Sequence, residues 1–296
     1  MPLSREDRWL TGCLLLVLAL TAAMLGVNAA AFHFTGISYF PRLATPLICV
    51  ALQFAYFDRI YLFISPRAGF IVKNCALYAL TGVVLTLFIT GLQFTPFPSI
   101  DPALRRWDQL LHFDTVALLA WTAAHPGLRA FLKVCYVSTD VQIVFAPLVA
   151  GFAFDRRRLR TYLYACVYST LAGGLFYYFF PSSGPGGVYR SPFFSPVQLY
   201  TSLKFYRVHH FQDVPSMLGG MIAFPSFHVS IAALTTYAAL PSRRLFWAVA
   251  ALNVLVVAST LLLGWHFLVD VPAGLALGGL SLYAGERTHR RLTKPL

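Results

Sequence analysis

The chain has 296 residues, of which 58% are hydrophobic and 16% aromatic, while only 11% carry a charge. In an ordinary soluble domain about a quarter of the residues are charged. A soluble domain of this size cannot bury as much apolar surface as this chain carries. This composition excludes a soluble enzyme, a disordered chain and a nucleic-acid-binding module, so the net charge of +12 needs another explanation.

Long apolar runs alternate with short charged clusters along the whole chain. A helix needs about 20 apolar residues to cross a bilayer. The runs therefore predict an all-α integral membrane protein with about eight transmembrane helices. In chain order we expect these helices at residues 10–32, 43–63, 70–92, 130–154, 160–180, 224–240, 244–263 and 266–285.

The basic residues indicate an orientation for these helices. An even number of spans puts both termini on one side, and the clusters at 156–160, 243–244 and 287–291 fall on that side. Lys and Arg mark the cytoplasmic side of membrane proteins. We therefore expect both termini in the cytoplasm. We attribute most of the positive charge to the cytoplasmic Lys and Arg residues that set this orientation.

Two long loops fall on the opposite side. Residues 93–129 contain the amphipathic segment DPALRRWDQLLHFD, which predicts an interfacial helix. Residues 181–223 are rich in Pro, Gly, Ser and aromatic residues. A loop of this length without its own structure is usually functional or disordered. The organisation predicts N-terminal transmembrane helices and an outer interfacial segment over 1–129, followed by a catalytic region over 130–296 that could recruit one earlier helix.

Two histidines stand out near the outer ends of the predicted helices. In FPSFHVS, Ser226 and His228 follow Pro225 in the first turn of a helix, where free N–H groups attract phosphate. In STLLLGWHFLVDVPAG, His266 and Asp270 are four residues apart and would face the same way on one helix. A carboxylate on one imidazole nitrogen leaves the other nitrogen free to attack.

The two motifs together predict phosphoryl transfer through a covalent intermediate. One imidazole attacks phosphorus, and the other protonates the departing oxygen. Either motif alone is weak, because an H-x-x-x-D pair is most often a structural ion pair. Their joint occurrence, in this order and on one predicted face, favours catalysis.

Pro225-Ser226-Phe227-His228 and Ser259-Thr260-x5-His266-x3-Asp270 resemble motifs of the type 2 phosphatidic acid phosphatase superfamily. That family carries K-x6-R-P, P-S-G-H and S-R-x5-H-x3-D. The FPSFH form, Thr260 and the stretch GLFYYFFPSSGP are similar to the branch that contains fungal inositol phosphorylceramide synthases.

The resemblance covers roughly residues 130–285 and implies a six-helix phosphatase-type core. It implies that His266 is the nucleophile and forms a phosphohistidine, and that Asp270 orients it. His228 would be the acid for the leaving group and then the base for the acceptor. Ser226 would hold phosphate oxygens.

The chain departs from this family pattern at two positions. It has no K-x6-R-P before the sixth predicted helix, and threonine replaces the arginine of the third motif. A transition state rich in negative charge needs other cations. We expect Arg190 first, and then Lys204 and Arg207, although each could simply contact lipid headgroups. No metal site and no cofactor are expected.

The expected function is therefore a membrane phospholipid headgroup phosphotransferase that moves phosphoinositol or a similar headgroup onto a ceramide-like lipid alcohol. The alternative within the same chemistry is a lipid phosphate phosphatase for phosphatidic acid or polyprenyl pyrophosphate. An alternative of another class is a proton- or ion-coupled transporter that uses Asp140 and Asp270, but the chain lacks the repeated halves common in transporters. The expected partners are a phospholipid donor, a lipid or water acceptor and the bilayer, with no nucleic acid, and the site lies on the extracytoplasmic face.

Overall fold

The computed structural model describes residues 4–32, 65–153, 155–212 and 222–294, and within these ranges it is all-α. The prediction of the fold class is confirmed for this part of the chain. The long helices are α1 (Arg5–Phe32), α3 (Pro66–Leu92), α6 (Pro126–Phe152), α7 (Arg156–Phe179), α10 (Arg243–Leu262) and α11 (Asp270–Thr293). The shorter elements are α4 (Asp101–Leu110), α5 (Thr115–Ala123), the 3-10 turn η2 (Pro185–Gly187), α8 (Pro196–His209) and α9 (Phe227–Ala238).

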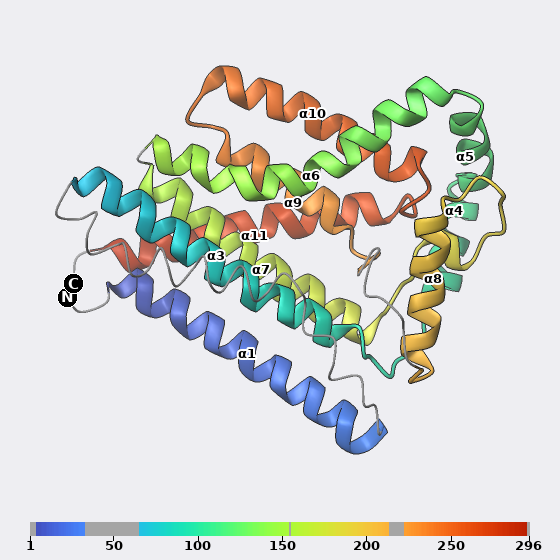
Figure 1. Ribbon diagram of the computed structural model, residues 1–296, viewed down its shortest axis with the longest axis horizontal. Helices are drawn as coiled ribbons and strands as arrows, with labels where there is room; N and C mark the ends of the chain where they lie inside the picture. The colour runs from blue at the N-terminus through green and yellow to red at the C-terminus, as the bar shows by residue number, and fades with distance from the viewer. Residues whose placement is uncertain (1–3, 33–64, 154, 213–221, 295–296) are drawn as a thin grey trace.

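The long helices run side by side as a bundle, as Figure 1 shows. Helices α4, α5 and α8 gather at one end of this bundle, together with the turn that joins α10 to α11. The start of α1 and the end of α11 meet at the opposite end, where the Arg5 guanidinium donates to the Lys294 carbonyl over 3.4 Å. Both ends of the described chain therefore lie at the same end of the bundle.

The expected count of eight transmembrane helices is wrong for the described residues. Four helices there are long and apolar enough to cross a membrane: Arg5–Phe32, Ala68–Leu92, Pro126–Gly151 and Arg243–Leu262. Helix α9 has only 12 residues, short of the roughly 20 that a span needs. Helices α7 and α11 are long but are diluted by polar and small residues, and the expected helix at 43–63 lies outside the described residues. Several long apolar helices still indicate a multi-pass membrane protein.

Helix α7 is the centre of the bundle. All of its residues from Leu159 to Val167 are buried. Those from Tyr162 to Val167 belong to one apolar core that also contains Leu14 of α1, Phe88 of α3 and Leu234 of α9. Helices α1, α3, α7 and α9, which are far apart in the sequence, therefore pack around one core.

Helix α11 packs closely on α9 through glycines. Gly274 and Gly278 face the first turns of α9, and a Cβ at Gly278 would lie 3.0 Å from the Ser230 carbonyl oxygen. Only glycine permits two helix backbones to approach so closely. This contact places the first turn of α11 beside the first turn of α9.

Both long segments between the predicted transmembrane helices contain helices of their own. The amphipathic segment forms α4, with Asp101, Leu104 and Asp108 on its buried face. The long loop over 181–223 contains η2 and α8 in its described part. Helix α8 begins with a capping box between Ser195 and Gln198, and this S-x-x-Q signal could have predicted it.

Candidate active site

The structure brings His228 and His266 together at the end of the bundle opposite the termini. His228 is in the first turn of α9, and His266 lies in the turn between α10 and α11. Their ring centroids are 6.0 Å apart, and the ring planes meet at 63°. The two imidazoles, which the sequence separates by 38 residues, therefore line one site.

Asp270 lies directly behind His266. The His266 Nδ1 and the Asp270 Oδ2 are 3.0 Å apart, and the same oxygen accepts the N–H of Phe267 over 2.9 Å. The Asp270 side chain is fully buried, and His266 is 3% exposed. A hydrogen bond from Nδ1–H to a carboxylate assigns the tautomer that leaves Nε2 as an acceptor.

This pair forms in a different local structure from the expected one. We expected both residues on one helix over 266–285, but α11 begins at Asp270 and His266 lies before it. The carboxylate of Asp270 accepts from the backbone of Phe267, so it closes the turn that leads into the helix. The four-residue spacing therefore fits a helix entry as well as a helix face.

Ser226 connects the two halves of the site. It is the N-cap of α9, so the helix begins at Phe227 and not at residue 224 as expected. Its Oγ lies 3.1 Å from the Nε2 of His266, and its backbone N–H donates to the Asp270 carbonyl over 3.3 Å. With Nδ1 committed to Asp270, the serine hydroxyl donates to Nε2. Burial lowers the pKa of His266, which keeps its imidazole neutral.

Two aromatic rings, which the sequence analysis did not single out, line the same site. Tyr136 of α6 stacks on His228 with centroids 4.1 Å apart and ring planes at 23°. Trp265, which precedes His266, stacks on Tyr136 with centroids 5.3 Å apart. No spacing rule links residue 136 to the two histidine motifs, so these contacts depend on the fold.

Two buried aspartates of α4 hold the loops around the site. The Asp108 Oδ1 accepts the N–H of Leu268 over 3.0 Å, which ties α4 to the turn that carries His266. Burial raises the pKa of Asp108, and hydrogen bonds from Leu268 and Thr115 act against this effect. Asp101 accepts from the backbone N–H of Ser183 over 3.0 Å and from the side chains of Ser182 and Ser183.

Asp101 thereby fixes the PSSG stretch against the histidine turn. Gly184, the last residue of that stretch, has φ of +80°, and a Cβ there would lie 2.9 Å from the Trp265 carbonyl oxygen. Both the left-handed backbone and the close approach require glycine. The sequence showed PSSGPGG as a feature of the outer loop but gave no sign that it packs beside His266.

Thr260 stands where the related motif has arginine, and it supports the backbone of the turn. Its hydroxyl donates to the Val257 carbonyl over 2.7 Å. Its carbonyl accepts the N–H groups of Trp265 and His266 over 2.9 and 3.2 Å. The side chain is fully buried, so this position helps to shape the turn and supplies no cation.

The three cations expected at the site occupy different environments. Arg190 is exposed in the loop before α8, and Arg207 is half-buried near the end of α8. Lys204 is buried on the same helix, and burial lowers its pKa to about 8. Helix α8 adjoins the histidine turn, because the Gln198 amide donates to the Leu263 and Gly264 carbonyls. A phosphate-binding role for these three cations stays a prediction.

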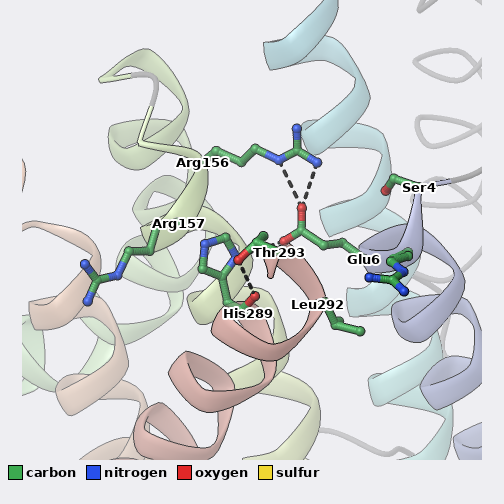
Figure 2. A pocket seen from close by; sticks show the side chains of 8 residues that line it. Ser4, Glu6, Arg156, Arg157, His289, Leu292 and Thr293 are labelled. Atoms are coloured by element: carbon green, nitrogen blue, oxygen red, sulfur yellow. Dashed lines mark hydrogen bonds and ion pairs between the residues drawn. The ribbon is translucent and has the colours of Figure 1, made fainter. Parts of the chain in front are cut away.

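A hollow lies at the other end of the bundle, close to both ends of the described chain. Its volume is about 530 Å³, and it is lined by Ser4, Arg5, Glu6, Arg156, Arg157, His289, Leu292 and Thr293. Figure 2 shows Glu6 reaching the Arg156 guanidinium, with which it makes hydrogen bonds of 2.7 and 3.0 Å. Helix α11 has 24 residues and spans about 36 Å between Asp270 and this hollow. The hollow is therefore separate from the histidine site.

Asp140, which the transporter alternative invokes, lies on α6. Its side chain is exposed on a helix that is apolar enough to cross a membrane. Among the described residues, no group of three or more His, Cys, Asp and Glu side chains is arranged to hold a metal ion.

Comparison with known proteins identifies the family of this chain. Residues 102–284 match the PAP2 superfamily, and this match begins earlier than the expected resemblance, so that it includes α4 and Asp108. No curated protein and no solved structure matches the chain. The match covers more than half of the chain and contains both histidines, their carboxylate and the serine between them. The chain therefore belongs to the PAP2 superfamily and carries an enzyme domain of that family, whose members act as phosphatases or phosphotransferases.

Proposed function

We propose that the protein transfers the phosphorylated headgroup of a phospholipid through a phosphohistidine on His266. The observation that carries this proposal is the pair of imidazoles 6.0 Å apart, with Asp270 hydrogen-bonded behind His266. A neutral imidazole held by a carboxylate on Nδ1 presents the Nε2 lone pair as a nucleophile. We assign the second imidazole, His228, to proton transfer at the leaving oxygen.

The reaction consists of two displacements at phosphorus. In the first, the His266 Nε2 forms a bond to phosphorus, the bond from phosphorus to the leaving oxygen breaks, and protonated His228 gives that oxygen its proton. In the second, neutral His228 takes the proton of the acceptor hydroxyl, the acceptor oxygen bonds to phosphorus, and the N–P bond breaks. Atoms and charges balance, and both histidines return to their starting states.

Ser226 has a specific part in this scheme. Its hydroxyl lies 3.1 Å from Nε2, so an arriving phosphate oxygen can take over that hydrogen bond. The first turn of α9 adds free backbone N–H groups beside it. Arg190, Lys204 and Arg207 are our candidates for further phosphate contacts.

For the substrate, we propose a phosphodiester donor such as a phosphoinositol lipid, and a ceramide-like lipid alcohol as acceptor. The support is Thr260, which leaves the third motif without a cation. A phosphodiester carries less negative charge than a phosphomonoester, so it needs a weaker clamp. Residues 130–296 would supply the catalytic region and residues 1–129 the additional transmembrane and interfacial segments, with both termini cytoplasmic and the site facing away from the cytosol.

The alternative is a lipid phosphate phosphatase for phosphatidic acid or polyprenyl pyrophosphate, because PAP2 superfamily membership is compatible with water as acceptor. The same membership favours an enzyme over the ion-coupled transporter considered from the sequence.

The experiment is an acceptor competition with purified protein in mixed micelles. We expect a radiolabelled phosphodiester donor to yield labelled product lipid when a ceramide-like alcohol is present, and His266→Gln to abolish it. Arg244→Gln is the control, because it is an exposed residue near the opposite end of the bundle. Release of only water-soluble phosphate, with no lipid product at any acceptor concentration, would contradict transfer and support the phosphatase.

A further inference from the structure

The ring of His228 is held by aromatic contacts. Tyr136 lies nearly flat against it, with centroids 4.1 Å apart, and the Trp265 ring stacks on Tyr136 at an interplanar angle of 10°. In the described part of the chain, no hydrogen bond to either nitrogen of His228 accompanies these contacts. The orientation of this imidazole therefore depends on the stack.

This arrangement matters for the proposed reaction, in which one nitrogen of His228 has to point toward the leaving oxygen of a substrate bound at His266. An unrestrained imidazole rotates about both side-chain bonds, and each lost orientation reduces the productive fraction. The ring of Tyr136 blocks rotation of the His228 imidazole on one side. An aromatic face also attracts a cation, so it favours imidazolium and opposes burial and the neighbouring His266, which lower the pKa of His228.

We propose that Tyr136 is a positioning residue that holds His228 and stabilises its imidazolium form for proton transfer to the leaving oxygen. This inference rests on the proposed role of His228 as general acid. In the step itself, the proton leaves the imidazolium nitrogen as the P–O bond breaks, and neutral imidazole remains against the tyrosine ring. Three other titratable groups lie near His228 and Tyr136. His266 faces His228, Asp140 acts electrostatically on Tyr136, and Asp270 lies behind His266.

The test compares two variants that separate the ring from its hydroxyl. Tyr136→Phe keeps the stacked face, and we expect its turnover to stay within about twofold of the unaltered protein. Tyr136→Leu removes the face, and we expect the alkaline limb of kcat to move to lower pH by about half a unit to one unit. Phe145→Leu is the control, because it removes an exposed aromatic ring from the same helix.

A second measurement makes the inference independent of turnover. The imidazole resonances of His228 can be titrated by NMR in detergent in the unaltered protein, Tyr136→Phe and Tyr136→Leu. We expect a lower titration midpoint only in Tyr136→Leu. If His228 gives a complete titration curve with the same midpoint in all three proteins, the proposed role of Tyr136 is overturned. A shifted midpoint in a protein that forms no phosphohistidine would instead support the stack and contradict the proposed function.

Discussion

The backbone of Gly274 lies against the carbonyl oxygen of Ser226, and a Cβ at position 274 would stand 2.5 Å from that oxygen. The same glycine is one helical turn after Asp270, which holds His266. The contact between α11 and α9 therefore sets the distance between the carboxylate-supported histidine and the serine at the start of α9.

Replacing Gly274 by alanine tests this relationship. Overpacking of a close backbone contact costs about 1–3 kcal/mol, and here it would also push Ser226 away from His266. We expect Gly274→Ala to lower the unfolding temperature in detergent and to reduce turnover by more than the loss of folded protein explains. Gly279→Ala is the matched control on the same helix, because nothing lies within 4 Å of its Cβ position. Equal effects of the two substitutions would show that the close approach is unimportant.

Asp108 gives a second prediction, because it links α4 to the histidine turn. Asp108→Ala leaves the part-buried N–H of Leu268 without its acceptor, at a cost of about 1 kcal/mol. We expect reduced stability and a larger fall in kcat than in substrate affinity, since the turn carries His266. Asp108→Asn keeps an acceptor oxygen and should retain most of the activity. If the alanine and asparagine variants behave alike, the hydrogen bond does not position the turn.

The pH dependence follows from the environment of His266. Burial lowers its pKa from 6.5 to about 4, so the imidazole stays neutral as the pH falls through 6.5. Because attack requires the neutral form, we expect the acid limb of kcat/KM to lie below pH 6.5 and to approach pH 4. The rate should be followed with a phosphodiester donor, whose own ionisation does not change in this range. An acid limb above pH 6.5 would mean that His266 does not have to be neutral.

The residue pairs of the candidate site could be predicted from sequence because they lie in two short motifs. Ser226 and His228 are two residues apart, and His266 and Asp270 are four apart, so local spacing alone pairs them. Asp108 and Leu268 are 160 residues apart, and Tyr136 meets His228 across two helices. Such contacts depend on how helices pack, which the apolar pattern of a membrane protein specifies only loosely.

The membrane helices illustrate the same limit. Hydropathy correctly located the long helices α1, α3, α6 and α10. It overestimated the span of α9, because the uncharged run around it continues beyond the 12 helical residues. An absence of charge therefore predicted burial in the protein or the bilayer, but not the length of the helix.

The central claim is that His266 carries the phosphoryl group during turnover. The most direct measurement is to quench the purified protein during reaction with a phosphorus-labelled donor, and to locate the label by peptide mass spectrometry under conditions that preserve phosphohistidine. The account predicts label on His266, absent from His266→Gln and increased when His228→Gln slows the second displacement more than the first. Label on another residue, or full turnover in His266→Gln, would contradict it.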